Sequence, residues 1–349
     1  MKKLCVFTLY GEKGASSRYR CFIYKDLLQQ EFETKWFSFW NDRYVTQYMH
    51  FKKKFALQIL LLYVFSLTKR FFQLYFIAPK ADVVLFQKAC LPKIRYNGIR
   101  RLKKRNVKIV FDVDDAVYVQ KNDYSDEIAK QADVIICGNK TLLNHYKSIN
   151  ESTFVLPTVE NTNLFEKYWR NTFDKKIIGW IGSLTTTNNI EVVLNPLNKF
   201  LSKHPEVRFI VISNGLGEIE GKIKRCELIQ WEEKKYIKDL SQISIGIMPL
   251  KDNEFNRGKC GFKLIQYLNL KKPVVASDVG VNSEIVENNG FLAHSEDEWL
   301  EYFERLLFNR TIYDDKVCNI EKFFLAKYHY NIVSKKFIDF LKRENDDFS

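Results

Sequence analysis

The chain has 349 residues, of which 46% are hydrophobic and 15% aromatic, so it can bury a large core and is long enough to favour two domains over one. A formal net charge of +13 favours an anionic partner, such as nucleic acid, nucleotide phosphates or an acidic membrane surface. The seven cysteines contain neither a CxxC pair nor a Cys/His cluster at zinc spacing, which argues against a disulfide scaffold and a structural zinc site.

The N-terminal sequence MKKLCVFTLYGEKG starts with basic residues, but Gly11 and Glu12 interrupt it before an apolar stretch of signal-peptide length. We therefore expect a first strand here, in a protein that is not exported. Short β-branched or aromatic runs then alternate with helix-like stretches along the whole chain. The runs cover residues 4–9, 34–39, 83–86, 107–113, 134–137, 154–156, 177–181, 207–212, 227–229, 245–248, 274–276 and 290–292.

Nearly continuous apolar strands between helices are typical of parallel sheets covered on both faces. Because the pattern restarts after Asn161, it predicts an α/β protein with two Rossmann-type, doubly wound parallel-sheet domains that face each other across a cleft. We place a first domain at residues 1–165 and a second domain at residues 166–325. A C-terminal helix within residues 326–349 is expected to pack back on the first domain.

Residues 50–79 approach membrane character. The apolar stretch at residues 55–68 is shorter than the roughly 20 residues of a spanning helix, so we do not expect it to cross a bilayer. Lysines precede it, and Lys69 and Arg70 follow it. Two interpretations remain open: an interfacial helix that binds anionic lipid, and a buried helix with charged ends.

The loop that enters a helix at residues 252–270 combines glycine with lysine. Helix N-termini attract phosphate, and glycine lets the backbone come close to a ligand. If the helix begins near Cys260, Lys259 and Lys263 share one helical face and together could hold a diphosphate. The alternative is a solvated, basic helix start.

Four stretches resemble family 4 glycosyltransferases of the GT-B fold, especially a bacterial surface-polysaccharide branch. The stretches are DNEFNRGKCGFKLIQYLNLKKPVVASDVGVN (252–282), KKIIGWIGSLTTTNN (175–189), SSRYR (16–20) and FDVDDAVY (111–118). The resemblance is strongest in the second half of the chain. It implies a GT-B-like fold and a retaining, metal-independent transferase. The enzyme would move a sugar from a nucleotide diphosphate sugar, a co-substrate, to a lipid-linked, lipopolysaccharide or capsule glycan, with no cofactor.

The resemblance also implies that residues 1–165 bind the acceptor and that residues 166–325 bind the nucleotide-sugar donor. It further implies roles for individual residues. Lys259 and Lys263 would neutralise the departing diphosphate, with backbone donors from the turn at Gly182 and Ser183. The base would lie near Gln230 and Trp231, although Trp231 could equally fill the core. The other donor-side residues are Gly258, Cys260, Gly261, Phe262 and Gln266.

The usual glutamate pair of the family is absent, because Gly258 and Gln266 occupy its positions. An amide can still donate to and accept from ribose hydroxyls. The missing pair also supports an alternative, in which the chain is a catalytically inactive nucleotide-sugar-binding subunit of a polysaccharide assembly complex.

The aspartates of FDVDD have several possible roles. Asp112, Asp114 and Asp115 could cap a helix, bind a hard cation or serve acceptor chemistry, with Asp114 or Asp115 as a candidate base. Arg18 and Arg20 could contact phosphate or acceptor. No metal site is expected.

The five histidines are not spaced as metal ligands. The basic run at residues 95–108 has few aromatic residues that could stack on bases, so we expect no nucleic-acid partner. The expected partners are the nucleotide-sugar donor, a glycan or lipid-linked acceptor and an anionic membrane surface. These features together predict a cytoplasmic protein, peripheral at the inner face of the cell membrane.

Overall fold

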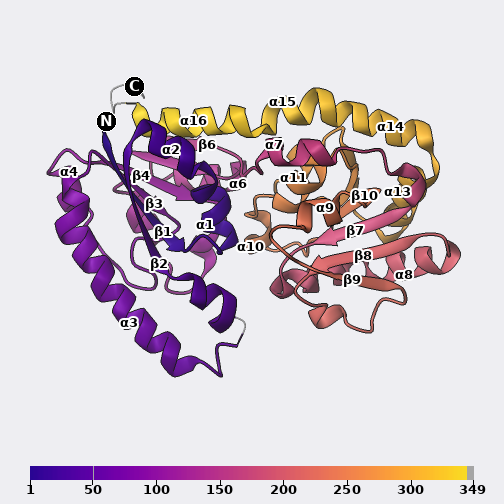
Figure 1. The fold of residues 1–349 in the computed structure, drawn as a ribbon, viewed down its shortest axis with the longest axis horizontal. Helices are drawn as coiled ribbons and strands as arrows, with labels where there is room; N and C mark the ends of the chain where they lie inside the picture. The colour runs from indigo at the N-terminus through magenta and orange to yellow at the C-terminus, as the bar shows by residue number, and fades with distance from the viewer. Residues whose placement is uncertain (50, 344–349) are drawn as a thin grey trace. The chain divides into compact units, whose positions relative to one another are not determined.

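The computed structural model describes residues 1–49 and 51–343 and contains two six-stranded parallel sheets (Figure 1). The first sheet has the order β2-β1-β3-β4-β5-β6 and the second the order β12-β11-β10-β7-β8-β9. All twelve predicted strands are present, so the predicted class, two doubly wound α/β domains with parallel sheets, is confirmed.

The structure divides into two compact units. Unit 1 comprises Met1–Thr158, Gly258–Cys260 and Val333–Ser349, and unit 2 comprises Val159–Arg257 and Gly261–Ile332. The three residues 258–260 thus belong to unit 1, although the segments on both sides of them belong to unit 2.

The strands of unit 1 are β1 (Lys3–Tyr10), β2 (Glu33–Trp40), β3 (Val83–Gln87), β4 (Lys108–Val113), β5 (Val134–Cys137) and β6 (Thr153–Val155). Its α-helices are α1 (Ala15–Arg20), α2 (Lys25–Glu31), α3 (Ala56–Phe72), α4 (Arg100–Lys103), α5 (Ser125–Ala129), α6 (Lys140–Lys147) and α16 (Tyr330–Lys342), the last of which enters unit 1 at Val333. Short 3-10 or π segments are η1 (Phe22–Tyr24), η2 (Tyr44–Tyr48), η3 (Gln73–Ile77), η4 (Ala78–Lys80) and η5 (Val117–Val119).

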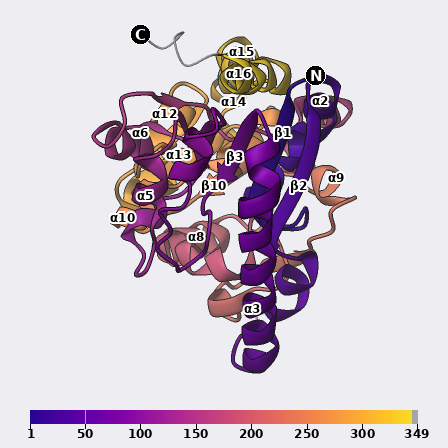
Figure 2. The ribbon, with the colours of Figure 1, turned by 90° about the vertical axis from the view of Figure 1, so that its left-hand side faces the viewer.

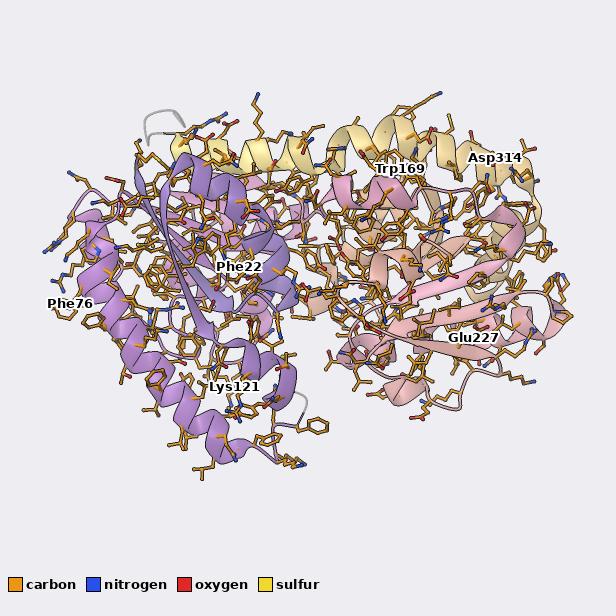
Figure 3. All side chains as sticks on the ribbon, viewed as in Figure 1. Phe22, Phe76, Lys121, Trp169, Glu227 and Asp314 are labelled. Carbon is orange, nitrogen blue, oxygen red and sulfur yellow. The ribbon has the colours of Figure 1, made fainter. Side chains whose placement is uncertain are left out.

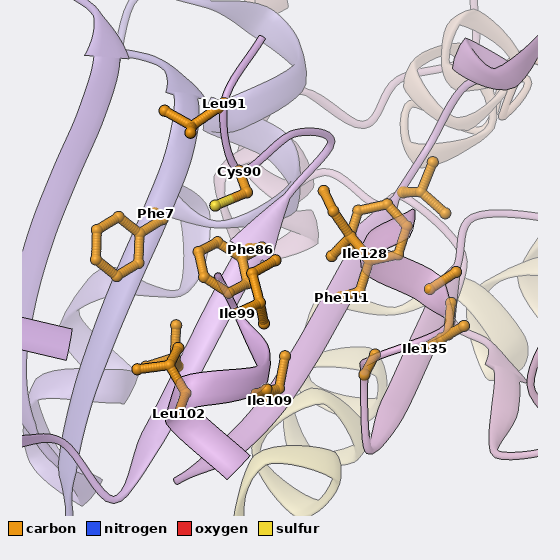
Figure 4. Packing of buried hydrophobic residues seen from close by; sticks show 14 of the residues in the cluster. Phe7, Phe86, Cys90, Leu91, Ile99, Leu102, Ile109, Phe111, Ile128 and Ile135 are labelled. Carbon is orange, nitrogen blue, oxygen red and sulfur yellow. The ribbon is translucent and has the colours of Figure 1, made fainter. Parts of the chain in front are cut away.

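The core of unit 1 lies between its sheet and the helices and loops that cover it (Figure 4). Phe7 and Phe86, on neighbouring strands, stack with ring centroids 5.3 Å apart. On the same sheet Gln87 pairs with Asp112, and Val113 pairs with Cys137. Because parallel strands end at the same edge, this register brings the loops after β1, β3 and β4 together.

Helix α16 packs against unit 1 through two aromatic contacts. The Phe337 ring lies 4.8 Å from the Tyr24 ring, and the Phe340 ring lies 5.2 Å from the Phe154 ring. Lys108 Nζ also donates to the Phe340 carbonyl at 2.7 Å. Helix α16 is thereby held to the first sheet.

The strands of unit 2 are β7 (Ile177–Ile181), β8 (Arg208–Ser213), β9 (Cys226–Gln230), β10 (Ile245–Met248), β11 (Val274–Ser277) and β12 (Gly290–Ala293). Its α-helices are α7 (Thr162–Phe165), α8 (Leu194–Lys203), α9 (Tyr236–Leu240), α10 (Glu254–Arg257), α11 (Phe262–Asn269), α12 (Asn282–Val286), α13 (Glu296–Phe308), α14 (Arg310–Asn319) and α15 (Leu325–Tyr328). The remaining short segments are η6 (Glu166–Tyr168), η7 (Phe173–Lys175), η8 (Leu184–Val193), η9 (Gly217–Ile219) and η10 (Ile320–Phe324). Trp180 of β7 is fully buried in the core of this unit.

The helix that contains α3 is longer than predicted. The helix continues without a break through η3 and η4, from Ala56 to Lys80. With 25 residues, it is long and apolar enough to cross a membrane, by length and composition alone. The length argument against a spanning helix is therefore wrong, because the aromatic run after Arg70 continues the helix. In Figures 1 and 2, α3 lies on the outside of unit 1 and extends past the ends of β1 and β2.

One face of this helix is exposed, which contradicts the interpretation as a buried helix. Only 22% of the residues in its most apolar stretch are buried. We call the following exposed residues the outer stripe; each is at least 41% exposed, and Phe76 at its far end is labelled in Figure 3: Leu57, Leu60, Leu61, Val64, Phe65, Phe71, Phe72, Tyr75 and Phe76.

The opposite face of the helix is anchored in unit 1. Ile59 and Tyr63 pack against an aromatic cluster that includes Phe39 and Trp40 of β2. The guanidinium of Arg70, which is buried, donates to the carbonyls of Thr8, Phe37 and Cys90 at 2.9–3.1 Å. Withdrawing this face from the sheet would leave those carbonyls without their donors, so the structure favours a helix that stays attached to unit 1.

Candidate functional site

The turn after β7 brings Gly182 and Lys263 together in unit 2. The N–H of Gly182 donates to the Ile212 carbonyl at 3.1 Å, so it is used within the sheet. A Cβ at Gly182 would lie 2.7 Å from Lys263 Cε and 2.5 Å from the Trp180 ring. Only glycine therefore leaves room for the lysine stem to pass over the strand end.

Lys263 is also positioned by an aromatic ring. Its Nζ lies 5.2 Å from the Trp180 ring centroid, within the range of a cation–π interaction. Ser183, the next residue after Gly182, is exposed and precedes η8. The ammonium group and the start of η8 thus lie near the carboxyl end of β7, where ligands of parallel sheets usually bind.

The prediction that Lys259 and Lys263 share a helical face is wrong. Helix α11 begins at Phe262, which is half-buried, and not near Cys260. Gly261 stands before it with φ +63°, a left-handed conformation that ends any helical continuity with Lys259. Only Lys263 lies on the helix, and Lys259 belongs to unit 1.

Side-chain contacts connect the residues that were predicted to bind the base and the ribose. The ring of Trp231, half-buried, stacks on Tyr236 with centroids 5.9 Å apart. The hydroxyl of Tyr236 donates to Glu160 Oε1 at 3.1 Å, and Gln266 Nε2 donates to the same oxygen at 2.8 Å. Gln230, at the end of β9, is exposed and donates to Asn214.

Sequence reasoning missed Glu160 and Tyr236. Glu160 is 3% exposed and lies 106 positions before Gln266 in the chain, within the range predicted for the first domain, although the structure places it in unit 2. Its carboxylate stands beside the amide that occupies the place of the family's usual glutamate. Unit 2 therefore has a buried carboxylate at this position, although it comes from a different part of the chain.

In unit 1, Arg20 and Asp112 form a buried ion pair. The guanidinium contacts Asp112 through Nε at 3.0 and 3.1 Å and through a second nitrogen at 2.5 Å, and it also donates to the Leu156 carbonyl at 2.7 Å. Both side chains are at most 2% exposed. In this arrangement they hold α1 to the ends of β4 and β6. Arg18 points elsewhere, with its Nε 2.9 Å from the Glu12 carbonyl.

Asp114 and Asp115 share a cation that sequence reasoning missed. Lys88 Nζ lies 3.1 Å from Asp114 Oδ1 and 2.5 Å from Asp115 Oδ2, and Ser16 also donates to Asp114 at 3.0 Å. Burial alone would lower the pKa of Lys88, but the two carboxylates outweigh it and raise that pKa. Lys88 follows β3 directly, and its position after a predicted strand was the one signal that could have found it.

Burial raises the pKa of Asp114, and the charge of Lys88 opposes this shift. Each aspartate of FDVDD is thus paired with a cation of the protein itself, Asp112 with Arg20 and the other two with Lys88. Within residues 1–49 and 51–343, no group of three or more His, Cys, Asp or Glu side chains is arranged to hold a metal ion.

Residues 258–260 pack onto this carboxylate cluster. Cys260 Sγ donates to the Asp114 carbonyl at 2.5 Å, and Asn139 donates to the carbonyls of Gly258 and Lys259 at 2.9 and 3.1 Å. A Cβ at Gly258 would lie 2.4 Å from that of Ala116. Burial lowers the pKa of Lys259, and the nearby charge of Asp115 opposes the shift.

The comparisons with known proteins agree with this arrangement. Residues 175–309 match the family model described as "Glycosyl transferases group 1". None of the curated proteins matches the chain significantly.

Three solved structures with this fold have low sequence identity. A TarM mutant from S. aureus, in complex with Fondaparinux, alpha-GlcNAc-glycerol and UDP, has a TM-score of 0.56 at 15% identity; the match covers 75% of this chain and 55% of that one. Anabaena Alr3699/HepE in complex with UDP-glucose has a TM-score of 0.65 at 14% identity, over 98% and 99% of the chains. The lipopolysaccharide outer core galactosyltransferase WaaB has a TM-score of 0.63 at 10% identity, over 97% and 98%.

The chain spans about half the length of TarM, and nearly the full length of the other two proteins. At these identities the likeness establishes the fold, and the family model matches most of the second unit. The chain has the GT-B fold, and its residues 175–309 match the model of group 1 glycosyl transferases.

Proposed function

We propose that this chain transfers a sugar, with retention of configuration, from a nucleotide diphosphate sugar to a lipid-linked or lipopolysaccharide or capsule glycan at the cytoplasmic face of the membrane. The observation that carries the proposal is the Lys263 side chain, which crosses Gly182 at the end of β7 within the group 1 domain. There its ammonium group can neutralise a departing diphosphate.

In the transfer, the acceptor hydroxyl oxygen forms a bond to the anomeric carbon of the donor sugar while the bond from that carbon to the phosphate oxygen breaks. The nucleoside diphosphate leaves with the bonding electrons. The acceptor proton goes to the leaving phosphate, or to Asp114 or Asp115 if one of them acts as base.

The proposed donor contacts in unit 2 follow the connected side chains. Trp231 offers an aromatic face for the base, and Glu160 and Gln266 offer hydrogen-bonding groups for the ribose hydroxyls. The missing glutamate pair is the argument for an inactive subunit. Because Glu160 supplies a carboxylate beside Gln266, this argument becomes weaker. The HepE complex with UDP-glucose makes uridine the first base to test.

A thermal-shift series with uridine, guanosine, thymidine and cytidine diphosphates tests donor binding. We expect one of them to raise the melting temperature, because a ligand that binds only the folded state stabilises it by about 2.7 kcal/mol at 100 times its Kd. No shift with any of the four would contradict the donor assignment. Turnover of the matching labelled nucleotide sugar, with membrane extract as acceptor, then separates an enzyme from an inactive binding subunit.

The outer stripe of α3 supports the proposed membrane partner. Lys52, Lys53 and Lys54, all exposed, precede it, and near its far end Arg101 lies 3.6 Å above the Tyr75 ring. Basic groups at both ends of an apolar helix face suit a helix that lies in the interface of an anionic bilayer.

Vesicle co-sedimentation tests this partner. We expect binding to vesicles that contain phosphatidylglycerol, and Leu57→Asp/Leu61→Asp/Phe65→Asp should abolish it, because each change places a carboxylate against lipid. These side chains are at least 63% exposed, so the fold should tolerate the change. Lys147→Ala, a change at an exposed lysine on α6, is the control and should still bind. Equal binding of the triple variant would rule out the outer stripe as the contact.

A further inference from the structure

Unit 1 contains a cavity of about 690 Å³ that the donor chemistry does not use. The carboxyl ends of β1 and β2 and the loops after β3 and β4 contribute residues to its lining. Its volume is within the range of ordinary ligand pockets.

One part of the cavity wall is aromatic. Tyr10, Trp40, Tyr44, Tyr63 and Tyr96 all contribute to it. The rings of Trp40 and Tyr44 stack with centroids 4.0 Å apart, and the Tyr63 hydroxyl donates to the Pro92 carbonyl at 2.7 Å. These contacts hold the rings in place, so the wall is a preformed apolar surface.

The charged groups of the cavity are mostly cationic. Four lysines line it, and the single carboxylate among the lining residues is Asp123. Asp123 is engaged by Ser125, and burial raises the pKa of its carboxyl group. The lysines are Lys52, Lys88, Lys93 and Lys121. Because Asp114 and Asp115 already neutralise Lys88, the surplus positive charge comes from Lys52, Lys93 and Lys121. Such a surplus in a partly enclosed space attracts an anion.

The cavity is continuous with the outer stripe of α3. Ala56, Ile59, Leu60 and Tyr63 of α3 line the cavity, and Leu60 also belongs to the outer stripe, with 57% of its surface exposed. An apolar path therefore leads from the cavity to the helix face that we assign to the bilayer. An anion bound among the lysines could keep an attached alkyl chain on this path.

We propose that this cavity binds the acceptor, and that the acceptor is an amphiphile in which a diphosphate joins a lipid chain to the glycan that carries the acceptor hydroxyl. This rests on the proposed function, whose acceptor it specifies. The phosphate lies among the lysines, the first part of the lipid chain lies against the aromatic wall, and the rest passes over Leu60 to the bilayer. Lys88 connects the cavity to Asp114 and Asp115, the candidate bases.

Calorimetric titration of the whole protein with n-dodecyl phosphate tests the proposal. Two partial probes separate the contributions: dodecanol carries the chain alone, and glycerol phosphate carries the phosphate alone. We expect dodecyl phosphate to bind at least about 10-fold more tightly than either, because only it meets both the cations and the apolar path. If dodecanol binds as tightly as dodecyl phosphate, the cavity does not recognise an anion. If glycerol phosphate binds as tightly as dodecyl phosphate, the apolar path does not bind a lipid chain.

Two variants locate the site. Lys93→Asn/Lys121→Ala removes two exposed cations and should weaken dodecyl phosphate binding at least 5-fold; asparagine suits the positive φ of 62° at Lys93. Leu60→Gln should weaken dodecyl phosphate but leave glycerol phosphate unchanged. The matched control Lys147→Ala should change neither. If both cavity variants bind as the unmodified protein does, the cavity is not the site.

A further probe separates an acceptor from an ordinary membrane lipid. Dihexanoyl phosphatidylglycerol offers a phosphodiester with two chains, and it should bind at least 5-fold more weakly than dodecyl phosphate. Equal binding would make the cavity a membrane-lipid site and overturn the acceptor assignment. These titrations need no donor, so their failure beside a positive nucleotide thermal shift contradicts this inference alone, whereas lipid phosphate binding with no nucleotide shift contradicts the proposed function.

Discussion

Lys263→Ala should lower the rate of sugar transfer about 100-fold or more in a protein that remains folded. The ammonium group is placed by Gly182 and Trp180 at the end of β7, where we assign the leaving diphosphate. Removing one preorganised group that stabilises developing charge typically costs 100-fold to 1,000-fold in kcat. The measurement is initial rate against donor concentration, with the melting temperature as a check on folding.

Three further variants test the role of Lys263. Lys263→Arg keeps the charge and should retain part of the rate. Gly182→Ala should lower the rate as well, because its Cβ would lie 2.5 Å from the Trp180 ring and 2.7 Å from the Lys263 stem. Lys238→Ala, at an exposed lysine on α9 of the same unit, should have no effect. A folded Lys263→Ala protein with the original rate would remove the leaving-group role of this lysine.

Arg20→Met should lower the free energy of unfolding of unit 1 by about 3–5 kcal/mol. The substitution leaves Asp112, which is fully buried, without the guanidinium that now contacts both of its oxygens. It also removes the donor to the Leu156 carbonyl. Urea denaturation followed by amide hydrogen exchange in β4 reports the change for unit 1 alone.

Two controls separate the loss of the ion pair from a general effect of the substitution. Arg18→Met, two positions earlier on α1 and half-exposed, should change the unfolding free energy by about 0.5 kcal/mol or less. The double variant Arg20→Met/Asp112→Asn should recover part of the loss, because it removes the unpaired buried charge. A loss below about 1 kcal/mol for Arg20→Met alone would show that the pair does not stabilise the interior.

The strands and the position of Lys263 were predictable because their signals are local. A run such as IIGWI between polar segments indicates a buried parallel strand, and β7 covers the same residues as its prediction. The exact start of α11 was not predictable, because the left-handed conformation of Gly261 depends on its surroundings. Ile285 lies where a side chain at this position would go.

The sequence predicted the apolar composition of the long helix, but it did not predict that one face of the helix is exposed. Its apolar residues suit both a core and a membrane interface, and the choice depends on whether another element covers them. Within unit 1, Arg70 and Tyr63 hold one face to the sheet and loops, while Leu57 and Leu61 on the other face remain exposed. Neither outcome follows from the hydrophobicity of the segment itself.

The sequence by itself determined that the protein has two α/β sheet units, that the loop before α11 is basic and glycine-containing, and that the second half resembles a glycosyltransferase. These properties depend on residue types and spacings along a short stretch of chain. The tertiary structure alone decided that Glu160 meets Gln266, that Lys88 joins Asp114 to Asp115, and that an aromatic cavity opens beside α3. Such contacts join residues far apart in the chain, so they depend on which strand ends become neighbours when the sheets form.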